Sequence, residues 1–174
     1  MQRVRLINIQ DQVEQALNKS SEFFEAQYQV RLGETAELAR DVVRQTMAML
    51  VTTPREAPWG GYLAVDEDTT AVVGTCGFKN GPTPDGTLEV AYFSFPMFER
   101  QGYGTAMAAK LLAIAIPSPS IRRVIAHTLP ERNASTRILE KIGMRFVGEV
   151  EDPEDGRVWQ WEKLREACYM DLLL

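Results

Sequence analysis

Residues 95–105 constrain the fold of this chain more than any other segment. They read Phe-Pro-Met-Phe-Glu-Arg-Gln-Gly-Tyr-Gly-Thr and follow residues 88–95, which have the composition of a strand. They lead into residues 102–115, where Lys110 is the only charged side chain. Because a helix that is apolar on nearly all sides must be mostly buried, this segment predicts a strand, a loop with two glycines and an interior helix.

The other elements follow from the period of the apolar residues, which is two in strands and 3.6 in helices. We predict strands at residues 3–9, 62–65, 71–78, 88–95, 123–128, 146–151 and 157–162. We predict one short helix that opens with a capping box at residues 11–14 and a second that starts at Ser20 or Ser21. Three further helices should span residues 34–51, 102–115 and 133–142. The last of these has Asn133 as N-cap and Gly143 beyond its end. The second to fourth strands should form an antiparallel meander, the last two a hairpin, and residues 164–174 a short amphipathic tail. This order predicts one mixed α/β domain over residues 1–174.

The composition excludes several classes of protein. Nineteen Lys and Arg residues against 24 Asp and Glu residues give a net charge of −5, so a basic nucleic-acid-binding stripe is not expected. No apolar run is long enough to span a bilayer, and the first residues lack the apolar stretch of a signal peptide. Cys76 and Cys168 are too few for a disulfide framework or a zinc site, and we interpret both as small buried side chains. We therefore expect a cytoplasmic protein without a metal, nucleic-acid or membrane partner.

The glycine loop at residues 100–105 has the chemistry of an anion site. Free N–H groups and the helix dipole attract negative charge at the start of a helix, and glycines let a diphosphate approach the backbone closely. Met107 stands where a dinucleotide-binding fingerprint has a third small residue, and the Gly-Lys-Ser/Thr sequence of a P-loop is absent. The alternative is a glycine-rich turn without a ligand.

Two motifs in this order resemble the GNAT superfamily of acetyl-CoA-dependent N-acetyltransferases. The first is Leu-Glu-Val-Ala-Tyr-Phe-Ser-Phe-Pro at residues 88–96 with Gly-Tyr-Gly at 102–104, and the second is Asn-Ala-Ser at 133–135 with Leu-Glu-Lys-Ile-Gly-Met at 139–144. The branch that it resembles most contains the ribosomal-protein N-terminal (alanine) acetyltransferases. The resemblance implies a mixed, mostly antiparallel sheet that is splayed between its fourth and fifth strands and flanked by helices. It also implies an acceptor side at residues 1–58, an acetyl-CoA-binding core at 60–162 and a C-terminal tail at 163–174.

The resemblance implies that acetyl-CoA lies in the opening between those two strands. A bulge near Phe93 and Ser94 would direct an N–H group at the thioester carbonyl and stabilise the oxyanion. The residues expected to bind the cofactor are Phe93, Ser94, Phe95, Arg100, Gln101, Gly102, Tyr103, Gly104, Thr105 and Asn133. Glu99 replaces the Arg or Gln that the family often has, so we expect its carboxylate to point into solvent. Asn133 lies one residue closer to the second motif than in many relatives, and the alternative is a helix N-cap.

The catalytic residues follow the same resemblance. Many relatives carry a tyrosine that protonates the leaving thiolate, but the matching position here is Leu139 or Glu140. Ser135 could donate a hydrogen bond to the sulfur instead, or it is a first-turn serine that bonds the backbone. For the base, His127 falls at the family's position, and the histidine side chain as a type suits proton transfer near neutral pH. Glu89 lies on the partner strand. Either could be structural, and then the amine loses its proton to water.

We therefore predict an N-acetyltransferase that moves acetyl from acetyl-CoA to a primary amine by direct attack in a ternary complex. The acceptor would be a small-molecule amine or a peptide N-terminus, and the family likeness implies that a homodimer is possible. Some aromatic residues either wall the acceptor side or belong to the core: Phe23, Phe24, Tyr28, Trp59, Trp159 and Trp161. The alternative function is a catalytically weak CoA-binding sensor, which the missing tyrosine favours.

Overall fold

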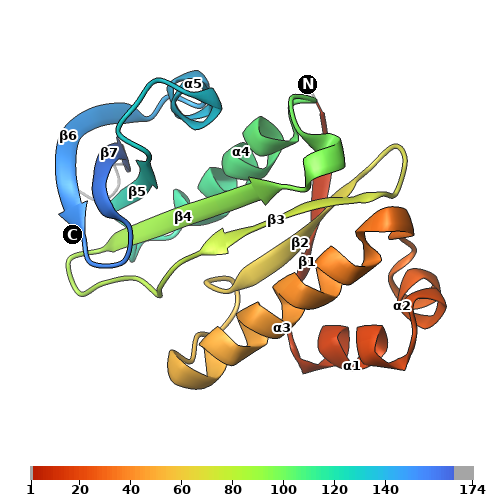
Figure 1. Ribbon diagram of the computed structural model, residues 1–174. Coiled ribbons are helices and arrows are strands. Elements are labelled where there is room, and N and C mark those ends of the chain that lie inside the picture. The colour runs from red at the N-terminus through yellow and green to blue at the C-terminus, as the bar shows by residue number, and fades with distance from the viewer. Residues whose placement is uncertain (1, 167–174) are drawn as a thin grey trace.

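The computed structural model describes residues 2–166, so most of the predicted tail, with Cys168, lies outside the described residues (Figure 1). The elements are β1 Val4–Asn8, α1 Asp11–Lys19, α2 Ser21–Tyr28, the 3₁₀ turn Gly33–Thr35, α3 Ala36–Thr52, β2 Gly61–Asp66, β3 Val72–Phe78, β4 Thr87–Ser94, the 3₁₀ turn Pro96–Phe98, α4 Tyr103–Ala115, β5 Arg123–Thr128, α5 Ala134–Lys141, β6 Arg145–Asp152 and β7 Gly156–Leu164. Within residues 2–166, no helix is both long enough and apolar enough to cross a membrane.

The strands form one seven-stranded sheet in the order β1-β2-β3-β4-β5-β7-β6. Its neighbours are antiparallel except β4 and β5, which are parallel. These two strands pair only from Thr87 opposite Arg123 to Glu89 opposite Ile125, although both continue. The predicted splay between the fourth and fifth strands is therefore confirmed, and so is the mixed, mostly antiparallel sheet.

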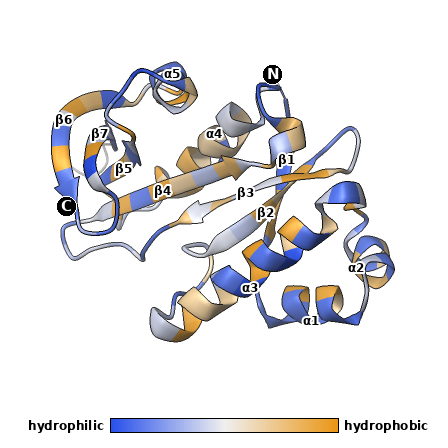
Figure 2. Cartoon of the chain, viewed as in Figure 1, coloured by the Kyte–Doolittle hydropathy of each residue, from blue (hydrophilic) through white to orange (hydrophobic). Residues whose placement is uncertain are grey.

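The helices cover opposite faces of the sheet because side chains alternate along each strand. On β2, Ala64 packs in the core cluster that includes α4, whereas its neighbours Leu63 and Val65 pack in the cluster formed with α1, α2 and α3. Figure 2 shows that α3 alternates between hydrophilic and hydrophobic residues, as expected for a helix with one solvated face. In contrast, nine of the thirteen residues of α4 are buried. This confirms the interior helix predicted from the sequence.

Local capping agrees with the sequence at most helix ends. Ser20 caps α2 by accepting a hydrogen bond from the N–H of Phe23, at 3.0 Å. Asn133 caps α5 in a reciprocal capping box with Thr136. The capping box predicted at residues 11–14 is wrong, because the N-cap of α1 is Gln10 and its side chain makes no capping bond.

Candidate active site

A cavity of about 600 Å³ opens where β4 and β5 diverge, and we refer to it as the cleft cavity. Its walls come from the end of β4, the loop before α4 and the first two turns of α5. The lining residues are Tyr92, Phe93, Ser94, Glu99, Arg100, Gly102, Gly104, Thr105, Ala134, Ser135, Arg137, Ile138 and Lys141. The volume lies in the range of small-molecule and cofactor sites.

The backbone of β4 faces the cleft cavity at alternate residues. The N–H of Phe95 donates to Val73 at 2.9 Å, and the pairing with β3 continues in regular register from Ser94 to Val90. In an antiparallel ladder only every second residue bonds the same neighbour, so Phe93 bonds β3 while Tyr92 and Ser94 direct their N–H and C=O groups toward the splay. The bulge expected near Phe93 and Ser94 is not found. Tyr92 was not predicted as a site residue. Because it lies two residues before the predicted Ser94, the alternation along the strand places both on the same edge.

The loop before α4 brings backbone N–H groups to the same cavity. Gly102 is the N-cap of α4 with φ 92°, a conformation that favours glycine, and Arg100 also has a positive φ of 59°. Gly104 allows close packing, because a Cβ there would lie 2.8 Å from Cδ1 of Ile138 on α5. Glu99 is exposed, as predicted, but it borders the cavity next to Arg100. Together the loop presents a helix N-terminus with free N–H groups to the cavity.

Several predicted cofactor residues direct their side chains elsewhere. Phe95 is fully buried in the core beneath α1 to α3, and the amide of Gln101 donates to the carbonyl of Met97 at 2.9 Å. Tyr103 is buried, and its hydroxyl donates to the carboxylate of Asp66 at 3.0 Å. These contacts hold the loop in place on the side away from the cleft cavity. The three side chains therefore position the loop and do not line the cavity.

The Asp66 carboxylate, which accepts the hydrogen bond from Tyr103, is held in its charged form. Burial raises the pKa of Asp66, but hydrogen bonds from Thr69, from Tyr103 and from the N–H of Asp68 outweigh burial and hold the pKa below its usual value. The same carboxylate also accepts from the N–H of Thr69 at 2.6 Å. The turn after β2 is thereby tied to the start of α4.

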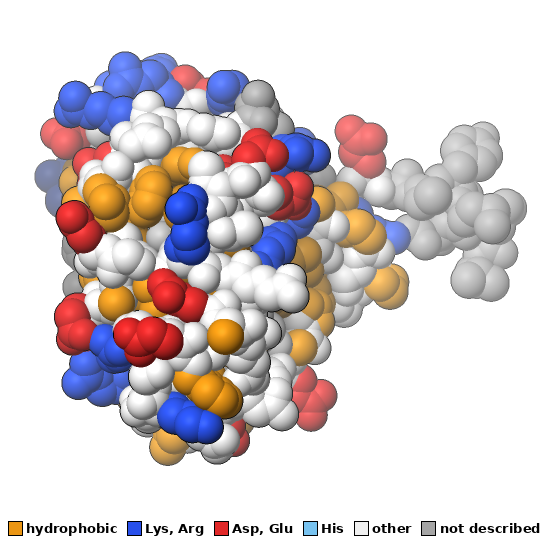
Figure 3. Space-filling view, turned by 90° about the vertical axis from the view of Figure 1, so that its right-hand side faces the viewer, with side chains coloured by type: hydrophobic (Ala, Val, Ile, Leu, Met, Phe, Trp, Pro, Cys, Tyr) orange, Lys and Arg blue, Asp and Glu red, His pale blue; other side chains and the backbone are white. Residues whose placement is uncertain are grey.

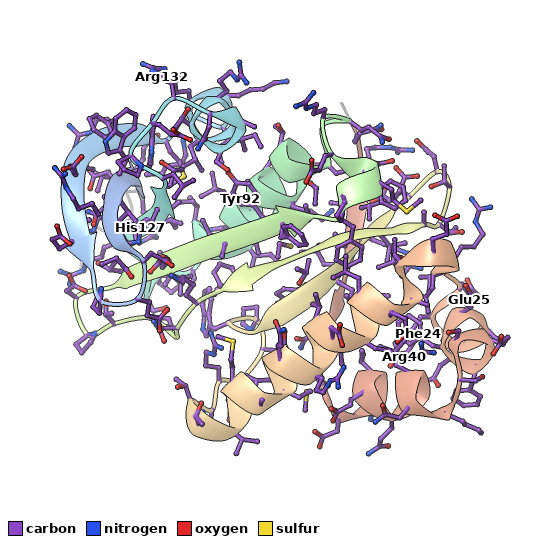
Figure 4. The ribbon with its side chains drawn as sticks, viewed as in Figure 1. Phe24, Glu25, Arg40, Tyr92, His127 and Arg132 are labelled. Carbon is purple, nitrogen blue, oxygen red and sulfur yellow. The ribbon has the colours of Figure 1, made fainter. Side chains whose placement is uncertain are left out.

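The start of α5 contributes Ser135 to the cleft cavity, whereas Asn133 serves as the helix cap and does not line it. Across the cavity, burial raises the pKa of Tyr92 to about 12, and the nearby Ser135 hydroxyl opposes this shift. Within residues 2–166, the buried Tyr92 hydroxyl has no hydrogen-bond partner of normal geometry. The hydroxyl groups of Tyr92 from β4, labelled in Figure 4, and of Ser135 from α5 thus lie near each other.

His127 and Glu89 form a pair on the opposite face of the sheet from α4. His127 Nδ1 lies 2.9 Å from Glu89 Oε1, and His127 Nε2 lies 3.2 Å from Gln160 Oε1. Lys79 Nζ lies 3.3 Å from the same Glu89 oxygen, and Asp152 is 3.9 Å from His127. The predicted proximity of the two candidate bases is therefore observed, but neither residue lines the cleft cavity. Figure 4 shows His127 in the β5–β7 region, apart from Tyr92.

Two further cavities lie beyond the cleft cavity, and the first of them shares wall residues of β4 with it. The first, the apolar cavity, has a volume of about 210 Å³ and shares Tyr92 and Phe93 with the cleft cavity. The second, the charged cavity, has a volume of about 350 Å³ and is bordered by Glu89, Asp152 and Glu154. The two share the side chains of Met49, Arg55 and Lys79. The apolar cavity therefore shares wall residues with the cleft cavity on one side and with the charged cavity on the other.

None of the aromatic residues weighed for the acceptor side lines the cleft cavity, the apolar cavity or the charged cavity. Phe24, labelled in Figure 4, is fully buried, and its ring centroid lies 4.7 Å from that of Tyr28. Trp59 packs edge-on to Phe78 at 5.4 Å. Trp159 and Trp161 both contact Phe146 of β6. Phe23 is 40% exposed and lies under the ammonium of Lys19. Within the described chain, no cluster of three His, Cys, Asp or Glu side chains could hold a metal ion.

Comparison with known proteins identifies the family. A sequence profile described as Acetyltransferase (GNAT) domain matches residues 3–145. The chain belongs to the GNAT acetyltransferase family. The membership predicted from the two sequence motifs, in a family of acyltransferases, is therefore confirmed.

Individual GNAT relatives are distant. YjdG of Bacillus subtilis (strain 168), named an uncharacterized N-acetyltransferase, is 28% identical over 82 residues, which are 47% of this chain and 49% of that protein. The alignment thus spans about half the length of this relative. A GNAT-family acetyltransferase structure from Bacillus anthracis matches with a TM-score of 0.63 at 20% identity, over 96% of this chain and 100% of that one. RimL, a ribosomal L7/L12 alpha-N-protein acetyltransferase in complex with coenzyme A, matches with a TM-score of 0.62 at 15% identity, over 95% and 96%. At these identities the structural matches show the GNAT fold.

Proposed function

We propose that this GNAT protein transfers the acetyl group of acetyl-CoA to a primary amine, by direct attack of the amine in a ternary complex. The observation that carries the proposal is the end of β4, where Tyr92 and Phe93 border both the cleft cavity and the apolar cavity. A thioester bound in the cleft cavity can therefore meet an amine bound in the apolar cavity at this strand end. Cys76 offers no covalent route, because burial raises the pKa of its thiol to about 12.

The residues around the cleft cavity suit a CoA thioester, which supplies the activated acetyl group. The unpaired backbone groups of Tyr92 and Ser94 can bond the amides of an extended pantetheine arm. The N-terminus of α4 suits a diphosphate, and the cations of Arg100, Arg137 and Lys141 border the same cavity. The complex of RimL with coenzyme A supports the same ligand for this chain.

We assign the chemical roles by direction and access. The N–H group of Tyr92 stabilises the negative charge that develops on the thioester oxygen, since it points into the splay. The N–H group of Ser94, two residues further along the strand, bonds the pantetheine arm. Ser135 donates a hydrogen bond to the leaving sulfur, because its side chain borders the cleft cavity. Glu89 accepts the proton of the amine, because it borders the charged cavity, and His127, with both ring nitrogens engaged, positions Glu89.

The acceptor side of the proposal follows from the adjoining cavities. A small-molecule amine or a peptide N-terminus would enter through the charged cavity and reach Phe93 through the apolar cavity. Residues 1–58 would form the acceptor side, residues 60–162 the acetyl-CoA core and residues 163–174 the tail. A cytoplasmic location stays a prediction from the composition, and a homodimer stays a prediction from the family resemblance. Figure 3 shows basic and acidic side chains interspersed on one face of the molecule, without a single-sign stripe.

A CoA-binding sensor with little catalysis is the second candidate. It is favoured by the absence of the usual family tyrosine, since Leu139 or Glu140 occupies the matching position. We expect coenzyme A to bind under both hypotheses, so calorimetric titration tests the cleft cavity alone. Incubation of the full chain with acetyl-CoA and an amine panel, with mass detection of products, tests transfer. Turnover of the thioester only in the presence of amines supports the acetyltransferase, and tight CoA binding without any product supports the sensor.

A further inference from the structure

Arg55 occupies an unusual position in the loop between α3 and β2. Its side chain borders three cavities: the apolar cavity, the charged cavity and a shallow one near α1. One terminal nitrogen donates to the carbonyl of Phe78. The Nε atom is buried without a hydrogen-bond partner. No acidic side chain lies within ion-pair distance of Arg55 in residues 2–166.

Arg55 thus forms no ion pair, although Glu89, Asp152 and Glu154 border the charged cavity that it also lines. The other cation that borders the apolar cavity, Lys79, has Glu89 at 3.3 Å and Asp155 at 3.8 Å. No Asp or Glu lies among the lining residues of the apolar cavity. Although the chain has a net charge of −5, this cavity presents one free guanidinium and one neutralised ammonium to whatever enters.

A partly buried guanidinium without an ion pair needs an explanation. Burial lowers the pKa of Arg55, so its surroundings already disfavour the charge. Supporting the Phe78 carbonyl uses only one of its donors, and an uncharged amide could do the same. A buried donor without a partner is costly, and such groups recur where a ligand completes the network. A planar guanidinium matches the two oxygens of a carboxylate or phosphate.

The position of Arg55 relative to β4 defines what kind of ligand would fit. Arg55 and Phe93 border the same cavity of about 210 Å³, and the surface between them includes Met49, Cys76 and Ala91. A molecule bound there would have its acidic group at the guanidinium and its other end at the strand where the acetyl group is expected. The wall between the two ends is apolar and suits a short hydrocarbon spacer.

We propose that the acceptor is a small primary amine that also carries a carboxylate or a phosphate, and that Arg55 binds this acidic group. This inference rests on the proposed acetyl transfer and narrows its substrate class. The guanidinium would hold the molecule so that the amine lies near the end of β4. A cationic or purely apolar amine would leave Arg55 unpaired and would bind more weakly.

Matched amine pairs test the inference. The full chain is assayed at saturating acetyl-CoA with glycine against glycinamide, 4-aminobutyrate against butylamine, and phosphoethanolamine against ethanolamine. We expect kcat/KM to be at least tenfold higher for the acidic member of at least one pair. The carboxylate and phosphate pairs separate the two sources of the acidic group.

Variants at Arg55 connect the preference to this side chain. In Arg55→Gln, whose amide can still donate to Phe78, the ratio of kcat/KM between the acidic and neutral members should fall to about one. Arg55→Lys, which keeps the charge without the planar fork, should give an intermediate ratio. Arg44→Gln is the matched control, because Arg44 is an exposed arginine of α3 that pairs with Asp41, and its ratio should equal that of the wild type. Thermal unfolding checks that all variants are folded.

The outcomes separate the two levels of the proposal. Acetylation of neutral amines at rates equal to or above those of the acidic ones overturns this inference and leaves acetyl transfer standing. So does an undiminished acid preference in folded Arg55→Gln and Arg55→Lys. If no amine is acetylated although coenzyme A binds, the proposed function itself fails, and this inference fails with it.

Discussion

Replacing Gly104 by alanine tests the packing between α4 and α5 beside the cleft cavity. A Cβ at this position would lie 2.8 Å from Cδ1 of Ile138, 3.6 Å from the Ser94 hydroxyl and 3.7 Å from the Tyr92 ring. Carbon atoms in contact prefer about 3.5–4.0 Å, so the Ile138 side chain must move by more than about half an ångström. Ile138 belongs to the wall of the cleft cavity, and its displacement should alter the site of coenzyme A.

The expected magnitude has two parts. Overpacking costs about 1–3 kcal/mol, and the better helix propensity of alanine over glycine returns about 1 kcal/mol. The free energy of unfolding of Gly104→Ala should therefore fall by about 0–2 kcal/mol, which leaves the protein folded. We expect the affinity for coenzyme A to fall about tenfold, or about 1.4 kcal/mol.

A second substitution makes the cause specific. Ile138→Val removes the Cδ1 atom that the new methyl group would meet, at a cost of about 0.5–1.5 kcal/mol in stability when made alone. In the double variant, calorimetric titration should show coenzyme A affinity restored toward that of Ile138→Val. The double-mutant cycle then gives a favourable coupling. Wild-type affinity in Gly104→Ala, or no recovery in the double variant, would refute the reasoning from this contact.

Three further predictions follow from the site. Ser135→Ala should lower kcat by about 10²-fold with little change in KM for acetyl-CoA, and steady-state kinetics with unchanged kcat would leave Ser135 a first-turn helix residue. Glu89→Gln should slow the reaction at saturating acetyl-CoA by about 10²-fold or more; if His127→Ala does this instead and Glu89→Gln is nearly silent, the base is the histidine. Asp66→Asn should destabilise the protein by about 1.5–3 kcal/mol at neutral pH, since it weakens hydrogen bonds to a charged group that include the one from Tyr103. Because the pKa of Asp66 is held below its usual value, this difference in unfolding free energy should be full above pH about 4 and shrink as the pH falls further. A difference that stays constant down to pH about 2 would contradict the role of the charged carboxylate.

The sequence predicted the elements around the site because each has a local signature. The glycine loop at residues 100–105, the apolar helix after it and the Asn133 cap are encoded by neighbouring residues. The proximity of His127 and Glu89 was predictable only from the family resemblance, because it depends on how two strands 38 positions apart pair.

What the sequence missed depends on register and on side-chain direction. The regular pairing of β4 with β3 decides that Tyr92, and not Phe93, directs its backbone into the splay. The motif around Tyr103 indicates where the backbone of the loop lies, but not that the side chain turns inward to Asp66. Arg55 lies in a loop without periodicity, so only the assembled cavities show where its guanidinium lies.

The strand end at Tyr92 and Phe93 also bears on which acyl groups the protein can use. Under the proposed function, a donor with a longer acyl chain extends its additional carbons past these residues into the apolar cavity. That volume of about 210 Å³ is where the amine must enter, so each methylene added to the donor reduces the size of the amine that still fits. Donor chain length and acceptor size are therefore coupled by geometry. A relative adapted to propionyl or longer thioesters would have to change its acceptor pocket at the same time.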